Sequence, residues 1–275
     1  MTQELKFGKL PPKIDERTIR LSSIIKRELL PPLPERYDVD EALNGIDDNR
    51  MFANDKYGCC VISAQAHQTF RFEKFEQGKQ IDITDQEVVD EYFEQTGGAD
   101  RGLILLLSLK HWRNSGWLVG GRNYTIYAFA SVDWKNHDEV CHCIHLLRGV
   151  DLGMNVYQKD IDQFNADEPW HLTGNDGELR GGHGIYLQNY ERDDIGITCT
   201  TWGRKQPMTW DFWDARVDEA YGIVDNRNEW MGDDSPVDVE EMDRQLKEIT
   251  GNGGEPQGCS FPPFTLMRNL LRRLT

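Results

Sequence analysis

The sequence predicts an α+β protein in which a helical half precedes an antiparallel β half. Apolar residues in the stretch 51–118 recur at the spacing of amphipathic helices. The stretch 119–225 instead contains short runs in which apolar and polar side chains alternate, as in strands with one buried face. The two halves form one predicted domain over residues 51–225, since 275 residues suit a single large domain with extensions.

The first 50 residues are predicted to form an extended arm. Prolines in Leu10-Pro-Pro and Leu30-Pro-Pro-Leu-Pro exclude long helices, so we expect one short helix near residues 17–28. The arm is interpreted either as a strap on the domain surface or as a propeptide-like cover over a cleft. The strap is favoured, because no cleavage signal is visible in residues 1–50.

The last residues, 226–275, form a predicted tail. It contains an acidic helix over 238–249, a Gly-rich linker and a short basic amphipathic helix near 266–274. A helix of about nine residues cannot bury its apolar face alone, so we expect this helix to dock on its own domain or on a neighbouring subunit. The neighbouring subunit is favoured, because the Gly-rich linker gives the helix reach. The expected partners are therefore other proteins or further copies of this chain, bound through the terminal arms.

The helical half is expected to contain three helices. The first begins at Cys60. The second follows a capping box formed by Thr84 and Glu87 and extends to about Thr96. The third runs from about Asp100 to Trp112. The β half is expected to contain strands at 124–132, 149–157, 183–190 and near 195–203, with helices at 137–147 and 210–221.

Composition limits the possible partners. The net charge of -16 argues against nucleic-acid binding, because phosphates require Lys and Arg, and it repels anionic membrane surfaces. The apolar run 103–109 is far shorter than a membrane span, and the N-terminus lacks the apolar core of a signal peptide. The expected location is the cytoplasm or a virion. The six cysteines are then expected to be mostly free thiols.

No motif indicates a cofactor or a metal. The Gly-rich stretches lack the strand, Gly-x-Gly and helix order of a nucleotide site. The cluster Cys141-His142-Cys143-x-His145 has four potential ligands, but a helix places them on different faces. Buried thiols and exposed histidines are the favoured interpretation. His67 is likewise expected to be a core histidine, and Cys59 to act independently of Cys60.

Cys60 is the candidate nucleophile. It follows the turn Asn54-Asp-Lys-Tyr-Gly58 and opens the first predicted helix. The partial positive charge of a helix N-terminus stabilises a thiolate and lowers the pKa of the thiol. The candidate base is His183, because flanking glycines leave its imidazole room and let other backbone approach closely. A thiol at a helix start and a histidine at a strand start suit Cys–His catalysis.

These motifs, in this order, resemble the papain-like cysteine peptidase superfamily over about residues 50–225. That family has an amide side chain six residues before the nucleophile, a Gly-His-Ala/Gly strand start and an Asn-Ser-Trp-Gly motif after the next strand. Here Asn54 stands six before Cys60, and His183 lies in Gly-His-Gly. The resemblance implies a two-lobed papain-like fold, with Asn54 and the Cys60 N–H holding the oxyanion.

The last motif reads Thr200-Thr-Trp-Gly203, so Thr200 stands where the resemblance implies an orienting Asn. The Thr200 hydroxyl would have to hold His183 weakly, and loss of such a group typically costs orders of magnitude in rate. Trp202 is expected to be core or a cover over His183. The chain also looks like a group of uncharacterised bacterial and bacteriophage proteins that share Asn-Asp-x-Tyr-Gly-x-Cys and Thr-Trp-Gly…Met-Thr-Trp-x-Phe-Trp. Cys59 stands where that group has Asp.

Two classes of function stay open. The first is a cysteine hydrolase or acyl-transfer enzyme that acts on peptides or cell-wall cross-links through Cys60 and His183. The second is a non-catalytic papain-fold module, for example a capsid- or tail-associated component of a bacteriophage virion. The lost Asn and the long terminal arms favour the second class.

Overall fold

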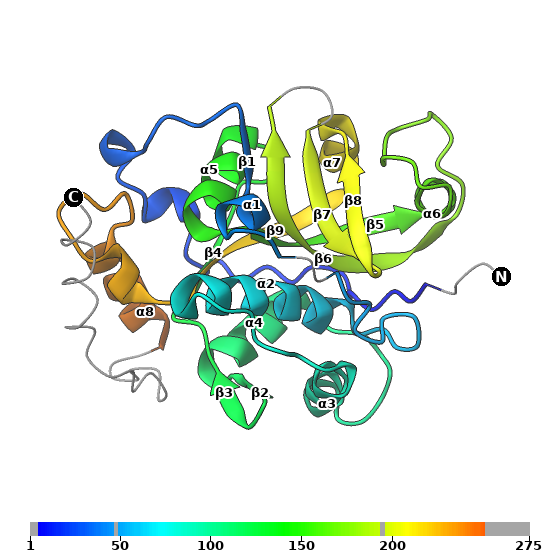
Figure 1. Cartoon of the computed structure of the whole chain (residues 1–275), viewed down its shortest axis with the longest axis horizontal. Coiled ribbons are helices and arrows are strands. Elements are labelled where there is room, and N and C mark those ends of the chain that lie inside the picture. Colours follow the sequence, from blue (N-terminus) through cyan, green and yellow to red (C-terminus); the bar gives the residue numbers. More distant parts are fainter. Residues whose placement is uncertain (1–4, 47–48, 193–195, 251–275) are drawn as a thin grey trace.

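The computed structural model describes residues 5–46, 49–192 and 196–250. Within these residues a helical lobe and a β lobe lie against each other, which confirms the predicted α+β, two-lobed class (Figure 1). None of the described helices combines the length and the apolarity needed to cross a membrane. The Gly-rich linker and the basic helix expected near 266–274 lie outside the described residues.

The helical lobe follows the predicted order. Its elements are α2 (Cys60–Gln77), α3 (Asp85–Thr96), α4 (Leu105–Asn114) and the hairpin of β2 (Trp117–Val119) and β3 (Arg122–Tyr124). The predicted capping box starts α3, since Thr84 accepts the Glu87 N–H and Glu87 accepts the Thr84 N–H. The third helix begins at Leu105 instead of Asp100, because Leu103 pairs with the arm in an extended conformation.

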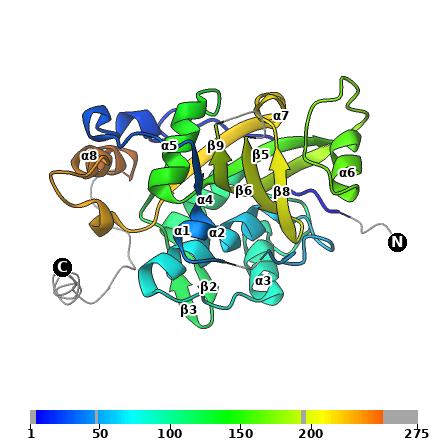
Figure 2. The same cartoon turned by 45° about the horizontal axis from the view of Figure 1, so that its top comes forward.

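The β lobe is one antiparallel sheet in the order β4-β9-β5-β6-β7-β8, with β1 paired to β6. Its strands are β1 (Arg36–Asp38), β4 (Ala128–Ser131), β5 (Val150–Tyr157), β6 (Leu179–Glu191), β7 (Ile197–Thr201), β8 (Arg204–Met208) and β9 (Val217–Val224). Helices α5 (His137–Leu147), α6 (Gln158–Asn165) and α7 (Trp210–Arg216) contact the sheet. Helix α5 lies against the face opposite α2 (Figure 2).

Three predicted elements of the domain are corrected. The predicted strand 124–132 is divided between β3 and β4, which belong to different sheets. The predicted helix 210–221 ends at Arg216, and the chain continues as β9. Pairing of β9 with both β4 and β5 supplies two ladders of hydrogen bonds, which outweigh the local helical pattern. His183 lies inside β6 and not at its start.

The described parts of the arm and of the tail pack on the domain. Instead of one helix near 17–28, the arm forms two 3-10 turns, Leu21–Ser23 and Arg27–Leu29, and then α1 (Val39–Ala42). The acidic helix of the tail is α8 (Val239–Thr250), after a 3-10 turn at Arg227–Trp230. Met242 and Leu246 of α8 are buried in the main core.

Candidate active site

Strand β6 brings the candidate base to the candidate nucleophile. Cys60 is the first residue of α2, and its sulfur accepts the N–H of Gly184 at 3.3 Å. That N–H belongs to the peptide that joins His183 to Gly184. A Cβ on Gly184 would lie 3.1–3.3 Å from three atoms of Val61, so glycine allows this close approach of β6 to α2. Two residues 123 positions apart in sequence (183 − 60) therefore meet in one site.

The imidazole of His183 is held on its ring face and at one nitrogen. It stacks on the indole of Trp202, with ring centroids 3.9 Å apart. Its Nε2 is hydrogen-bonded to the Thr201 hydroxyl at 2.6 Å, whereas the buried Nδ1 has no hydrogen-bond partner in the described residues. Nδ1 is thus the nitrogen that remains for proton transfer. Trp202 covers His183, in agreement with one of its two expected roles.

Thr201, and not Thr200, contacts the histidine. The hydroxyl of Thr200 accepts the side-chain N–H of Gln188 at 2.9 Å and lies 3.4 Å from the Asn49 amide oxygen. Successive side chains of a strand point to opposite faces, so two neighbouring threonines of β7 cannot both face His183. The predicted contact of Thr200 with the histidine is therefore corrected to Thr201. The alternation of side-chain directions along β7 was the signal that could have selected Thr201 in place of Thr200.

Asn54 is buried near the start of α2, as the oxyanion prediction requires, but its amide is engaged. Its side-chain N–H group donates to the carbonyl of Tyr57 at 3.0 Å and to that of Lys6 at 3.5 Å. The Lys6 N–H donates in turn to the Asn54 carbonyl at 3.2 Å. In this conformation Asn54 therefore fastens the arm beside Cys60, and its role toward an oxyanion stays a prediction.

Residues 5–10 of the arm, which we call the cleft segment, lie between the lobes. The Leu103 N–H donates to the Gly8 carbonyl at 2.7 Å, and the Leu10 N–H donates to the Leu103 carbonyl at 2.8 Å. On the other side, the Lys9 N–H donates to the Gly182 carbonyl at 3.0 Å. Figure 1 shows this segment as a dark blue trace between the sheet and α2. The favoured interpretation of a surface strap is corrected: here the arm covers the site.

The cleft segment fits only with glycine at its centre. A Cβ on Gly8 would lie 1.7 Å from the Gly58 carbonyl oxygen. The preceding ring, that of Phe7, meets Trp202 edge-on, with ring centroids 5.5 Å apart, and lies 6.2 Å from His183. Sequence reasoning missed Phe7, Gly8 and Lys9, because nothing in a local pattern shows that an N-terminal arm enters a distant cleft.

Burial favours the neutral forms of both side chains of the pair. Desolvation raises the pKa of the Cys60 thiol, although N–H groups of the surrounding backbone act in the opposite direction. Desolvation also lowers the pKa of His183 to about 3. The covered pair is therefore a thiol and a neutral imidazole. Burial thus opposes the thiolate that the helix N-terminus alone is expected to favour.

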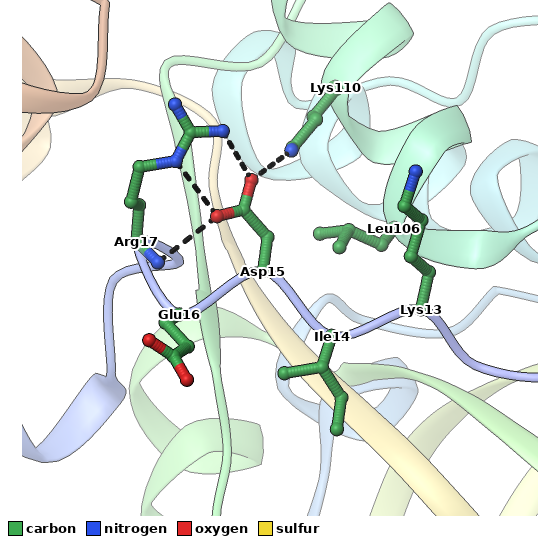
Figure 3. A pocket seen from close by; sticks show the side chains of 7 residues that line it. All are labelled: Lys13, Ile14, Asp15, Glu16, Arg17, Leu106 and Lys110. Atoms are coloured by element: carbon green, nitrogen blue, oxygen red, sulfur yellow. Dashed lines mark hydrogen bonds and ion pairs between the residues drawn. The ribbon is translucent and has the colours of Figure 1, made fainter.

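Beyond the cleft the arm is fastened to α4. Asp15 binds Arg17 at 2.8 Å and Lys110 of α4 at 2.6 Å (Figure 3). These residues line a surface cavity of about 530 Å³ beside Leu106. Between this anchor and the cleft segment, Pro11 and Ile14 are exposed. The exposed stretch therefore links two points of attachment.

The histidine and cysteines that were also considered as functional residues make structural contacts. His67 is buried and its Nε2 is hydrogen-bonded to the Arg50 carbonyl at 3.1 Å, as expected for a core histidine. The thiol of Cys59 donates to the Phe52 carbonyl at 3.3 Å. Cys141 and Cys143 are buried in α5, each as a free thiol. Among the described residues no group of three or more His, Cys, Asp or Glu side chains could hold a metal ion.

The arrangement of lobes and the cysteine at the start of α2 define the fold of papain-like cysteine proteases. Solved structures confirm this class of fold. Xylellain, a cysteine protease from Xylella fastidiosa, superposes with a TM-score of 0.65 at 15% identity, over 82% of this chain and 98% of its own.

Two further structures agree. Procathepsin B S9 from Trypanosoma congolense gives a TM-score of 0.56 at 11% identity, over 80% of this chain and 87% of its own. The cysteine protease CMS1MS2 from Carica candamarcensis, in complex with E-64, gives a TM-score of 0.54 at 15% identity, over 70% of this chain and 100% of its own. No protein-family model and no curated protein matches the sequence. The likeness is thus one of fold.

Proposed function

We propose that this chain is a papain-like cysteine hydrolase whose site is kept latent by the cleft segment. The observations that carry the proposal are the contact of the His183–Gly184 peptide with the Cys60 sulfur and the orientation of the His183 imidazole by Thr201 and Trp202. A scaffold without chemistry has no need of a thiol and an oriented imidazole in one interlobe cleft. Such a pair is the minimum for nucleophilic acyl transfer.

The proposed reaction begins when the cleft segment leaves. Cys60 Sγ attacks the carbonyl carbon of an amide while Nδ1 of His183 takes the thiol proton, and the leaving amine receives that proton as the acyl-enzyme forms. Water then releases the acid and restores the thiol. The Cys60 N–H is in the first turn of α2, where helix N–H groups lack intrahelical acceptors, and it would hold the oxyanion together with Asn54. Peptides and cell-wall cross-links both supply such amides.

Latency follows from desolvation. While the cleft segment is bound, the pair stays a neutral thiol and a neutral imidazole, and substrate has no access. Once water returns to the cleft, the helix N-terminus can stabilise the thiolate. The alternative, a non-catalytic module such as a bacteriophage virion component, is favoured by the same burial and by threonine in place of the orienting Asn.

A variant that displaces the arm distinguishes the hydrolase from the non-catalytic alternative. In the full chain, Gly8→Val places a side chain against the Gly58 carbonyl and should expel the cleft segment without changing the site. We expect Gly8→Val to cleave fluorogenic peptides or cross-linked cell-wall fragments, and Gly8→Val with Cys60→Ala to be inactive. Ile14→Ala, at an exposed position of the same arm, is the matched control and should stay latent. An open but inert Gly8→Val protein would favour the non-catalytic alternative.

A further inference from the structure

The cleft segment inserts one charged side chain between the lobes. The side chain of Lys9 is 1% exposed, and its ammonium group forms ion pairs with Asp218 and, at 3.2 Å, with Glu219. Its stem passes directly over Gly153, where a Cβ would lie 2.4 Å from the Lys9 Cε. A buried lysine is costly unless it is paired, so the surroundings of this ammonium form a built site.

Strands β5 and β9 build this site, which we call the acidic pocket and define as Asp151, Gly153, Asp218, Glu219 and Tyr221. Gly153 pairs with Glu219 while the next residue of β5 pairs two residues away on β9, so Asp218 is the extra residue of a bulge. A bulge lets two consecutive side chains reach the same ligand. The Tyr221 hydroxyl donates to Glu219 at 3.2 Å and fixes that carboxylate.

The acidic pocket contains one carboxyl group that Lys9 does not use. Asp151 is fully buried, and among the residues that the structure describes neither of its oxygens has a hydrogen-bond partner. It lies opposite Tyr221 and on the same face of β5 as Gly153, two residues and therefore about 7 Å further along the strand. A buried polar group without a partner is unusual in a folded protein.

Resting on the proposed function, we propose that the acidic pocket is the specificity pocket of the enzyme and takes a Lys or Arg side chain of a peptide substrate. The Lys9 N–H binds the carbonyl of Gly182, the residue before His183, so the pocket adjoins the candidate site. A peptide that follows the path of the cleft segment places a side chain there. An apolar side chain would leave Asp218 and Glu219 without a cation, which is the costly state of a broken buried pair.

Binding tests the pocket without catalysis. The hexapeptides Leu-Lys-Phe-Gly-X-Leu, with Lys, Arg, norleucine or Glu at X, are titrated calorimetrically into the full chain carrying Gly8→Val and Cys60→Ala. Lys and Arg peptides should bind at least about tenfold more tightly than norleucine, and Asp218→Asn with Glu219→Gln should remove the difference. Lys9→Glu, which places a carboxylate against the two acids, is a second way to open the chain if Gly8→Val fails to fold.

Hydrolysis tests the same pocket as a substrate site. Positional libraries of fluorogenic peptides, cleaved by the Gly8→Val chain with Cys60 intact, should show a preference for Lys and Arg at one position. If Lys and Arg peptides bind more tightly but no peptide is cleaved, the proposed function is overturned, whereas the assignment of the acidic pocket as a site for basic side chains is retained. Equal binding of norleucine, or cleavage without any basic preference, would overturn the pocket as a specificity determinant.

Discussion

The indole of Trp202 lies flat against the imidazole of His183, with ring centroids 3.9 Å apart and ring planes 17° apart. The contact sets the plane of the histidine, and the Thr201 hydroxyl then sets its rotation in that plane. Trp202 reaches this position with a φ of 42°, a left-handed conformation that costs a non-glycine residue about 1 kcal/mol or more. The surrounding turn between β7 and β8 maintains it.

Thr201 should control the rate of the opened enzyme. In the Gly8→Val chain, Thr201→Val removes the hydrogen bond to Nε2, and we expect kcat/KM to fall about tenfold to a hundredfold, with Thr201→Ser retaining most activity. Thr200→Val is the matched control on the opposite face of β7. A loss in Thr200→Val that equals the loss in Thr201→Val would show that β7 matters only for stability. Thermal melting of each variant measures that contribution.

The reactivity of Cys60 should depend on the arm. Because burial raises the pKa of the thiol, iodoacetamide should modify Cys60 of the native chain slowly at pH 7. In Gly8→Val the rate should rise, and its dependence on pH should move below the ordinary thiol pKa of about 8.5. Mass spectrometry of labelled peptides assigns the site. A rate in Gly8→Val that increases only near the pKa of a free thiol would contradict the nucleophile assignment.

Removal of the Lys9 charge should weaken the closed state of the chain, in which the cleft segment is bound. Lys9→Met leaves Asp218 and Glu219 without their cation, and we expect a loss of about 3 kcal/mol in the free energy of unfolding. Adding Glu219→Gln should restore part of that loss, because the uncompensated charge disappears. Chemical denaturation of the two single variants and the double variant gives the coupling energy. Strictly additive losses would mean that the pair does not interact.

Asp151 should make stability fall as the pH rises. Complete burial, together with the nearby Glu219, raises its pKa well above the ordinary value in the folded chain. Between the unfolded pKa of about 3.9 and that raised value, only the folded chain binds the proton, so about 1.4 kcal/mol is lost per pH unit. Asp151→Asn should therefore be more stable than the native chain at pH 7, with the difference vanishing near pH 4. A constant difference across that range would contradict this account.

The tail should be separable from the core. Helix α8 is packed through Met242 and Leu246, so truncation after Thr250 should leave the melting temperature nearly unchanged. We expect the same truncation to abolish self-association, measured by light scattering. Truncation after Asp238 removes α8 as well and is the control that should destabilise the core. Unfolding of the first truncation at a markedly lower temperature would show that residues 251–275 belong to the core.

Several parts of this protein were determined by local sequence. Helix α5 has the predicted bounds, and α3 starts at the capping box formed by Thr84 and Glu87, because caps and helical spacing act over a few residues. The start of α2 at Cys60 and the choice of His183 were also visible, since a thiol after a turn and a histidine between glycines are local signals. These features required no knowledge of distant partners.

The tertiary structure decided the rest. Strand β9 took the place of the C-terminal part of the helix predicted over 210–221, because β4 and β5 pair with β9 on both sides. That strand supplies Asp218 and Glu219. Thr201 contacts His183 in place of the predicted Thr200, because the register of β7 with β6 decides which face of β7 is turned toward His183. The cleft segment occupies the site only because Gly58, Leu103 and Gly182, far apart in sequence, meet around it. Such contacts arise from packing over long sequence separations, which no local pattern encodes.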